Sequence, residues 1–434
     1  MKSVEQQSVA VIGLGYVGLP LSLQFARSGV SVLGLDIDPA KVDALNAGRS
    51  YIGHIAAEVI AGPLREGRFS ASTDFSRVRE VQAVILCVPT PLNRNREPDT
   101  SYILATGASI APHLKPGTLV VLESTTYPGT TEELLREVLE RGSGMTAGKE
   151  FHLAYSPERE DPGNPESRVS EIPRVVGGLT PDCLQRAMEL YRPAIRTLVP
   201  VSSCRVAEAT KLLENIFRSV NIALVNELKV VYGAMGIDIW EVIHAAKTKP
   251  FGFMPFHPGP GLGGHCIPID PFYLSWKARE FGQATRFIEL AGEINTAMPE
   301  WVVQKVADAL NDRSKAVRGS RVLVLGLAYK SDVDDDRESP SYVLMQKLRQ
   351  RGAEVAYYDP HIPVIRPTRE HAQWAGTPSV AWDESVLRGF DAVLISTAHR
   401  SVDYRQLLEW APLIIDTRNV LSGMPSRPGQ VHRA

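Results

Sequence analysis

The chain has 434 residues, of which 44% are apolar and 22% are charged, and its formal net charge is -2 at pH 7. Domains usually hold ~100 to 200 residues, so a chain of this length predicts two or three domains. The nearly balanced charge argues against nucleic acid or an anionic membrane as partner, although a local basic pocket could still hold a phosphate. We therefore expect a small-molecule partner.

Four cysteines, Cys87, Cys183, Cys204 and Cys266, are too few for a disulfide framework, and none forms a CxxC pair. A reducing compartment is expected. The first residues pass from a polar segment directly into a strand-like run, and no run of 18 apolar residues occurs. We therefore expect a cytoplasmic protein.

The first 200 residues alternate between strand-like and helical patterns. Residues 8–36 read as strand, turn, helix and strand, and further apolar runs lie at 83–89, 118–124 and 151–157. Such alternation is typical of a parallel, doubly wound sheet. We predict a Rossmann domain over residues 1–200.

A different pattern begins near residue 202, where about thirty helix-compatible residues follow a pair of serines and end near glycines. Helical sequence resumes from about 270 to 312, so we predict a central helical domain over 201–312. Strand patterns return at 321–330 and alternate with helices to the end, which predicts a second Rossmann-like domain over 313–434. The expected fold is α/β, with two Rossmann-like doubly wound parallel-sheet domains joined by a long central helix.

The first turn of the chain carries a glycine pattern typical of dinucleotide binding. Gly13, Gly15 and Gly18 lie between a strand and a helix, where the chain can turn tightly and direct N–H groups at a pyrophosphate. Asp36 closes the next strand and can accept hydrogen bonds from an adenosine ribose. Its carboxylate would repel a 2′-phosphate, so NAD is favoured over NADP, although Lys41 could welcome such a phosphate. The alternative is three turn glycines and a surface aspartate.

The segment 250–271 is so rich in proline and glycine that it must be a shaped loop. Cys266 stands near its end, four residues before Asp270, where a helix can start. A thiol near a helix N-terminus is more acidic and more nucleophilic. Because Gly263 and Gly264 open the backbone before it, Cys266 is a candidate nucleophile.

Two other interpretations of Cys266 remain open. A free cysteine is more often a small buried hydrophobe, which is how we interpret Cys87. A zinc site with His265 is disfavoured, because adjacent residues seldom ligate one ion and no second ligand pair appears. No metal is predicted.

Polar residues at three further places could support chemistry. Glu208, Lys211 and Asn215 share one face of the predicted long helix, where Lys211 could stabilise an oxyanion and Asn215 could orient water or substrate. The alternative is an ordinary ion pair between Glu208 and Lys211. Glu158 and Thr125 each follow a strand, where doubly wound folds place reacting groups, or they are a loop glutamate and a turn hydroxyl.

The second Rossmann-like unit has GLAYK where the first has its glycine pattern, so a second dinucleotide is improbable. Lys330 and Arg337 could bind a substrate phosphate or carboxylate. Alternatively, these cations only balance the acidic neighbours Asp332, Asp334, Asp335 and Asp336.

Seven motifs in chain order resemble those of the UDP-glucose/GDP-mannose dehydrogenase family: GLGYVG, CVPTP, ESTTYPGTT, YSPER, EATKLLEN, GPGLGGHCIPID and YKSDVDDDRES. The cysteine loop is similar to that of the branch acting on UDP-N-acetylglucosamine. The resemblance implies an N-terminal NAD domain, a central domain that forms a homodimer or higher homo-oligomer, and a C-terminal domain that binds the UDP part. It also implies two NAD-dependent oxidations of C6 per sugar.

The resemblance implies roles for residues at matching positions. In the reaction these are Cys266 as nucleophile, Lys211 and Asp270 as polar helpers, Asn215 as a substrate contact, and Glu158 and Thr125 as groups managing water. The predicted coenzyme contacts are Gly13, Gly15, Tyr16, Val17, Gly18, Asp36, Lys41, Pro89, Thr90, Thr125 and Arg337. The predicted substrate contacts are Glu158, Arg159, Lys211, Asn215, Gly263, Lys330 and Arg418.

Two positions differ from the UDP-glucose members of the family. Ile269 stands where they commonly have a lysine, and only Lys249 and His257 could replace an arginine that reaches the neighbouring subunit's sugar. We therefore expect UDP-N-acetylglucosamine, with UDP-glucose or another UDP-N-acetylhexosamine as alternatives. Two rival hypotheses are a two-electron dehydrogenase with a structural Cys266 and an NAD sensor without turnover.

Overall fold

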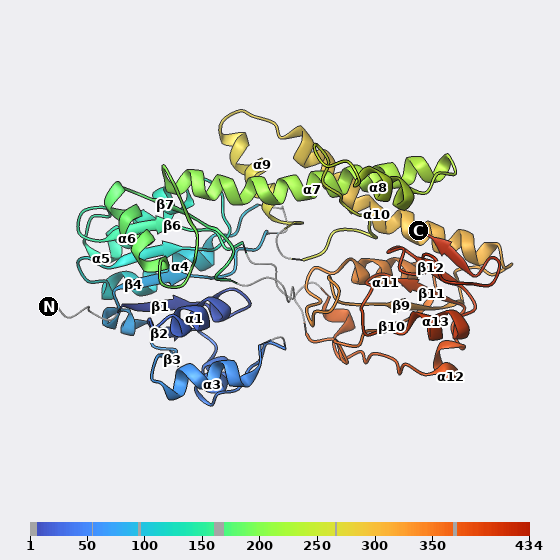
Figure 1. The fold of residues 1–434 in the computed structure, drawn as a ribbon, viewed down its shortest axis with the longest axis horizontal. Helices are drawn as coiled ribbons and strands as arrows, with labels where there is room; N and C mark the ends of the chain where they lie inside the picture. Colours follow the sequence, from blue (N-terminus) through green and yellow to red (C-terminus); the bar gives the residue numbers. More distant parts are fainter. Residues whose placement is uncertain (1–6, 54, 94–96, 160–168, 265–266, 368–370) are drawn as a thin grey trace. The chain divides into compact units, whose positions relative to one another are not determined.

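The computed structural model describes residues 7–53, 55–93, 97–159, 169–264, 267–367 and 371–434 (Figure 1). His265 and Cys266 lie outside the described residues. The chain forms two compact units, one of Met1–Asn215 with Ile269–Ala284 and one of Ile216–Pro268 with Thr285–Ala434. Each unit contains its own sheet.

The first unit is built on an eight-stranded sheet of order β3-β2-β1-β4-β5-β6-β7-β8. Its strands are β1 (Ser8–Ile12), β2 (Ser31–Leu35), β3 (Phe69–Ser72), β4 (Ala83–Leu86), β5 (Leu119–Leu122), β6 (His152–Tyr155), β7 (Arg174–Gly178) and β8 (Leu198–Val201). All neighbours are parallel except β6 and β7, where Ala154 faces Gly178. The carboxyl ends of β1, β2, β4, β5 and β6 therefore share one edge.

Helices pack on both faces of this sheet. The helices of this unit are α1 (Gly18–Arg27), α2 (Pro39–Asn46), α3 (Ala57–Arg65), α4 (Ser101–Ile110), α5 (Arg136–Ser143), α6 (Pro181–Tyr191) and α9 (Asp270–Glu280), with short segments η1 (Phe75–Glu80), η2 (Ala111–His113) and the π-helical η3 (Thr130–Leu135). Apolar residues of α1, α2, α3 and α6 form one core with the strands, and residues of α4, α5 and the start of α7 (Cys204–Ala234) form the other.

The helix α7 (Cys204–Ala234) spans 31 residues and matches the predicted central helix (Figure 1). The predicted helical stretch from 270 to 312 is two helices, α9 and α10 (Arg286–Asn311). They are separated at Gly282, whose φ of 67° lies in the left-handed region that favours glycine. None of the described helices combines the length and apolar composition needed to cross a bilayer.

The second unit has a five-stranded parallel sheet of order β10-β9-β11-β12-β13. Its strands are β9 (Arg321–Leu325), β10 (Glu354–Tyr358), β11 (Ala392–Ile395), β12 (Ile414–Asp416) and β13 (Val431–Arg433). Its remaining helices are α8 (Ile239–Ala246), α11 (Pro340–Gln350), η4 (Ala372–Trp374), α12 (Glu384–Leu387) and α13 (Tyr404–Trp410). Helices α10 and α11 share one core with the sheet, and α12 and α13 share the other. The predicted α/β fold with two doubly wound units is confirmed.

Candidate active site

The glycine turn after β1 has the shape that a pyrophosphate requires. Gly13 has a φ of 92°, and a side chain there would collide with the carbonyl of Cys87 on the neighbouring strand end. A Cβ on Gly18 would collide with the Gly13 carbonyl, whereas a Cβ on Gly15 would meet no protein atom within 4 Å. Gly13 and Gly18 therefore allow the turn, and Gly15 leaves open space before the N-terminus of α1, where a phosphate is favoured.

Asp36 follows β2 and is 5% exposed. Its Oδ2 accepts the Leu14 N–H at 2.9 Å, and its Oδ1 accepts the Asp38 N–H at 3.0 Å. The Lys41 ammonium lies 3.4 Å from Oδ2. The carboxylate is thus fixed beside the glycine turn, as a ribose site requires, and Lys41 points at this carboxylate. These residues fit an NAD coenzyme.

The other predicted coenzyme contacts in this unit lie on the same edge of the sheet. Tyr16 and Val17 are half-buried between the glycines, and Pro89 and Thr90 follow β4, which pairs with β1. The Thr90 carbonyl accepts a hydrogen bond from the Tyr273 hydroxyl of α9. The CVPTP segment is therefore tied to the helix that begins at Asp270.

Lys211, Asn215, Asp270 and Glu158 form a polar cluster in the first unit. The Asn215 amide donates to Asp270 Oδ2 at 2.5 Å, and the Lys211 ammonium donates to the backbone carbonyl of Glu158 at 2.6 Å. Lys211, Asn215 and Asp270 are each at most 9% exposed. The predicted helical face thus meets both the start of α9 and the loop after β6.

Burial raises the pKa of Asp270 to about 7, although the Lys211 charge and the Asn215 hydrogen bond lower it. A carboxyl group with a pKa near the working pH can accept and return protons efficiently. Asp270 is therefore suited to general acid–base chemistry.

A buried arginine that the sequence reasoning missed holds the Glu158 carboxylate. Arg174, at the start of β7, donates to Glu158 at 2.8 Å and to Glu123 at 2.6 Å. Glu123 also accepts a hydrogen bond from Tyr191. A charged residue opening the otherwise apolar strand RVVGG was the available signal, since a buried charge needs a partner.

The alternative interpretation was an ion pair between Glu208 and Lys211. The described contacts include no such pair. Glu208 instead accepts the N–H groups of Gly129 and Thr131 at 2.7 and 3.0 Å and the Thr131 hydroxyl at 2.7 Å. It therefore fixes the loop after β5 that carries Thr125. Burial raises the pKa of Glu208 to about 7, although these hydrogen bonds oppose the shift.

In the second unit, the loop before Cys266 lies against residues around Lys330. A Cβ on Gly263 would stand 2.8 Å from Pro340 and 3.0 Å from Tyr329, and one on Gly264 would stand 2.9 Å from the Tyr329 ring. Only glycines allow this close approach. Gly263 and the Tyr329–Lys330 segment, both predicted to serve the substrate, are therefore neighbours.

Arg418 lies at the other end of the same glycine-rich loop. A Cβ on Gly259 would stand 2.7 Å from the Arg418 guanidinium, whose Nε donates to the Ser396 carbonyl at 2.6 Å. Burial lowers the pKa of Arg418 to about 10. The half-buried guanidinium remains charged at neutral pH and could bind an anion.

Arg337 and Arg159 engage carboxylates of their own units. Arg337 makes two hydrogen bonds to Asp335, at 2.8 and 2.9 Å, which agrees with the alternative that it balances local acidic charge. Arg159 lies 2.7 Å from Glu214 and donates to the Pro173 carbonyl at 2.6 Å. The predicted contact of Arg337 with the coenzyme stays a prediction.

Family models match along most of the chain. Residues 7–195 match the NAD binding domain of the UDP-glucose/GDP-mannose dehydrogenase family, residues 205–297 its central domain, and residues 323–423 its UDP binding domain.

Known proteins similar to this chain carry related names. The UDP-N-acetyl-D-glucosamine 6-dehydrogenase of Pseudomonas aeruginosa is 37% identical over 90% of both chains. A solved UDP-D-ManNAc dehydrogenase from Pyrococcus horikoshii superposes with a TM-score of 0.88 at 32% identity, covering 98% of this chain and 99% of that one. A UDP-glucose dehydrogenase from Pyrobaculum islandicum gives 0.85 at 27% identity, covering 96% and 95%. The chain therefore belongs to the UDP-glucose/GDP-mannose dehydrogenase family and is an NAD-dependent UDP-sugar dehydrogenase.

Proposed function

We propose that this enzyme oxidises C6 of UDP-N-acetylglucosamine to a carboxylate in two NAD-dependent steps, through a thioester on Cys266. The observation that carries the proposal is the buried cluster of Lys211, Asn215 and Asp270, in the same unit as the glycine turn. Cys266 stands only four residues before Asp270 in the sequence, so a short segment of chain connects the cysteine to this cluster.

In the first oxidation, C6 loses a hydride and its hydroxyl loses a proton. The glycine turn and Asp36 would hold NAD, which would supply the hydride acceptor of both oxidations. Asp270 is the described carboxyl group with a pKa of about 7 in this cluster, so it can take the hydroxyl proton directly or through water. The nearby Lys211 charge stabilises the alkoxide that develops as the proton leaves. The product is an aldehyde.

The second oxidation needs a nucleophile, because an unhydrated aldehyde has no carbinol hydroxyl from which a second hydride transfer can start. Addition of the Cys266 thiol to the aldehyde carbon supplies that hydroxyl in a thiohemiacetal. Loss of a second hydride and a proton gives the thioester. The positive charge of Lys211 would stabilise the oxyanion of each tetrahedral species.

Water then releases the acid and regenerates the thiol. Glu158 and Thr125 occupy loops at the carboxyl ends of β6 and β5, where they can position this water. Because Arg174 and the Arg159 N–H both bind the Glu158 carboxylate, we assign Glu158 to orientation and Asp270 to proton transfer.

We assign the UDP part to the second unit, where Arg418 packs against Gly259 of the glycine-rich loop and the Tyr329–Lys330 segment packs against Gly263. A lysine and an arginine are suited to a diphosphate or a uracil carbonyl. The acetamido sugar is favoured by the Pseudomonas relative, which is named for UDP-N-acetylglucosamine. Ile269, where UDP-glucose members commonly have lysine, supports the same choice.

The substrate choice is tested by measuring kcat/KM for UDP-N-acetylglucosamine, UDP-N-acetylgalactosamine, UDP-N-acetylmannosamine and UDP-glucose side by side. We expect UDP-N-acetylglucosamine to have the highest value. A preference for UDP-N-acetylmannosamine, the sugar of the Pyrococcus neighbour, would move the enzyme to another branch without changing its chemistry.

The nucleophile is tested separately with Cys266→Ala and Cys266→Ser. We expect the alanine variant to make no acid and the serine variant to slow markedly or accumulate an acyl enzyme that mass spectrometry detects. Acid formation by Cys266→Ala at the wild-type rate would remove the thioester from the mechanism.

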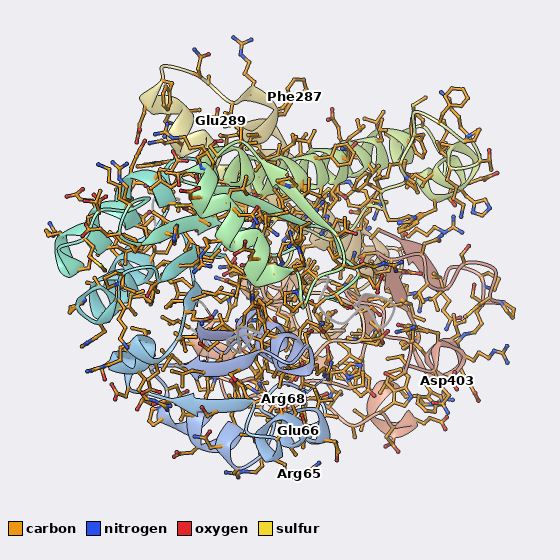
Figure 2. The ribbon with its side chains drawn as sticks, turned by 60° about the vertical axis from the view of Figure 1, so that its left-hand side comes forward. Arg65, Glu66, Arg68, Phe287, Glu289 and Asp403 are labelled. Atoms are coloured by element: carbon orange, nitrogen blue, oxygen red, sulfur yellow. The ribbon has the colours of Figure 1, made fainter. Side chains whose placement is uncertain are left out.

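We also propose that the enzyme is a homodimer formed through α7. Five large apolar residues on this helix and Met235, directly after its end, are 42–66% exposed; the five are Val206, Leu213, Phe217, Leu224 and Val231. Their spacings of seven and four residues place them in one stripe, as in helices that pair with a partner. Phe287, on the first turn of α10, is also exposed, at 78% (Figure 2).

A further inference from the structure

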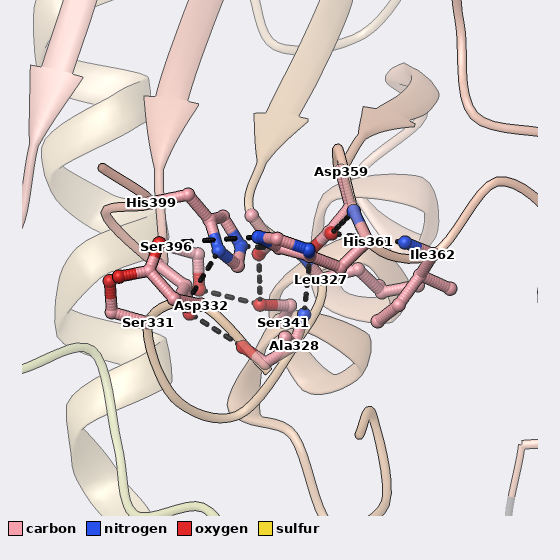
Figure 3. Close-up of polar contacts among 12 residues, drawn as sticks. Leu327, Ala328, Ser331, Asp332, Ser341, Asp359, His361, Ile362, Ser396 and His399 are labelled. Atoms are coloured by element: carbon pink, nitrogen blue, oxygen red, sulfur yellow. Dashed lines mark hydrogen bonds and ion pairs between the residues drawn. The ribbon is translucent and has the colours of Figure 1, made fainter. Parts of the chain in front are cut away.

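Two loops of the second unit are joined to each other by hydrogen bonds (Figure 3). The first, residues 328–332, follows β9, and the second, residues 397–400, follows β11. The Thr397 hydroxyl donates to the Ala328 carbonyl at 2.6 Å, and the Ser331 hydroxyl donates to the Ala398 carbonyl at 2.5 Å. Bonds therefore lie on both sides of Lys330.

His399 lies at the centre of these contacts and is 1% exposed. Its Nδ1 accepts the backbone N–H of Asp332 at 3.0 Å, so Nδ1 carries no proton. Its Nε2 lies 3.0 Å from Asp359 Oδ2 and must therefore be the protonated nitrogen that donates to this carboxylate. These contacts fix one neutral tautomer of the ring.

Asp359 holds the same place in the second unit as Asp36 does in the first. Each follows the strand beside the first strand of its unit, and each accepts the N–H two residues after that first strand, from Leu14 or from Leu327. Asp359 also accepts N–H groups from three further residues: Ala328, His361 and Ile362. Its carboxylate is therefore occupied by protein groups, where Asp36 retains capacity for a ribose.

We propose that the Asp359–His399 pair positions the Lys330 segment for the nucleotide part of the substrate. The proposal rests on the proposed function, in which Lys330 contacts that part. Asp332 has a φ of 61°, a conformation that costs energy in a residue other than glycine, and its carboxylate is held by Arg400 at 2.5 and 2.9 Å. His399 and Arg400 hold the turn in this conformation, and Lys330 stands two residues before Asp332 in the same segment.

A metal ion is the rival explanation of this cluster, because Asp332, His361 and His399 bring possible ligand atoms within 4.8 Å of one another. Of these three possible ligands, His399 and Asp332 already use their ligand atoms in other contacts. The Nδ1 lone pair of His399 accepts the Asp332 N–H, and the Asp332 carboxylate is paired with Arg400. The hydrogen bonds therefore favour a positioning role.

The test compares His399→Leu, which loses both hydrogen bonds, with His399→Asn, whose amide oxygen can still accept the Asp332 N–H. We expect His399→Leu to raise KM for the UDP-sugar about tenfold, as for the loss of one charged contact, with KM for NAD and kcat little changed. His399→Asn should recover much of this loss. His432→Gln is the control, because the His432 ring on β13 contacts the Gly429 carbonyl and takes no part in this cluster, and it should behave as wild type.

Unchanged KM for the UDP-sugar in both His399 variants would overturn the proposal, as would an equal rise in the two KM values together with a lower melting temperature. Stoichiometric zinc binding that His361→Gln abolishes would assign the cluster to a metal instead. Lys330→Ala, measured in parallel, separates the substrate role of Lys330 from the positioning role of His399. If Lys330→Ala leaves KM unchanged, the substrate role of Lys330 fails; if only the His399 variants leave it unchanged, the positioning role alone fails.

Discussion

Asp270 is the residue whose surroundings bear most directly on the chemistry. It is 3% exposed, accepts a hydrogen bond from Asn215, and has a pKa raised by burial to about 7. In the proposed mechanism its charged form is the base. We predict that kcat/KM rises with pH through an inflection near 7 and that Asp270→Asn loses both this limb and most of the activity. If the pH profile of Asp270→Asn keeps the wild-type inflection, the inflection belongs to another group.

The raised pKa of Asp270 also makes the stability of the folded protein depend on pH. Because the folded pKa exceeds the ordinary value, the folded state binds more protons than the unfolded state between pH ~4 and ~7, so this group lowers stability as pH rises through that window. Urea denaturation of wild type and Asp270→Asn at pH 5 and pH 7 measures the difference. We expect the wild type to lose more stability than the variant over this interval.

Sequence reasoning could name candidate site residues but not the groups that hold them in place. Asp36, Lys211 and Asp270 were chosen as candidates because each follows a strand, shares a helical face or starts a helix, and these are local properties. Arg174 was missed because its partners, Glu123 and Glu158, lie 51 and 16 residues away. Only the antiparallel entry of β7 beside β6 brings Arg174 to both carboxylates.

At the scale of elements, Arg174 joins the strand β7 to the loops after β5 and β6. Removing one partner of a buried ion pair leaves an uncompensated charge, which costs about 3 to 5 kcal/mol. We predict a loss of this order for Arg174→Met in chemical denaturation. The double variant Arg174→Met with Glu123→Gln should recover part of it, and an undiminished loss in the double variant would show that the pairing with Glu123 does not set the cost.

The glycine-rich loop offers a second test at this scale. Gly263→Ala would place a Cβ 2.8 Å from Pro340 and 3.0 Å from Tyr329, so the loop or the Lys330 segment must shift. We predict a higher KM for the UDP-sugar with KM for NAD little changed. Gly233→Ala is the control, since its Cβ meets nothing within 4 Å in α7, and it should stabilise the helix by about 0.5 to 1 kcal/mol. Equal KM values for Gly263→Ala and wild type would refute the packing argument.

The long helix and the largely apolar strands were predictable, whereas strands of mixed composition were not. The 31-residue α7 and the apolar strands β1, β4 and β9 have clear patterns. Strands β3 and β13 are short and contain polar residues, and β8 contains a proline. Their positions depend on pairing with strands distant in the sequence.

At the scale of the whole molecule, the exposed stripe on α7 predicts assembly. A charge introduced at the stripe would have to be buried in a dimer, so Leu224→Glu should shift the enzyme toward monomer. Arg141→Glu, on the exposed face of α5, introduces a charge of the same sign away from the stripe and should leave the assembly unchanged. Sedimentation velocity of both variants distinguishes the two states, and a Leu224→Glu protein that sediments as wild type would place the interface elsewhere.

The duplicated plan also divides the work between the units. Asp36 follows β2 beside a glycine turn that fits a dinucleotide, whereas its counterpart Asp359 is filled by backbone N–H groups and His399. One unit is therefore suited to the coenzyme, and the other can devote the corresponding edge to a different ligand. Two oxidations per sugar in one active site would require the coenzyme to be exchanged once during each turnover.

The measurement that addresses the four-electron claim most directly is the yield of NADH per uronic acid formed, with limiting UDP-N-acetylglucosamine, absorbance at the reduced nicotinamide band and quantification of the acid by chromatography. We predict two NADH for each acid. One NADH for each sugar consumed, with an aldehyde or ketone as the final product, would contradict it.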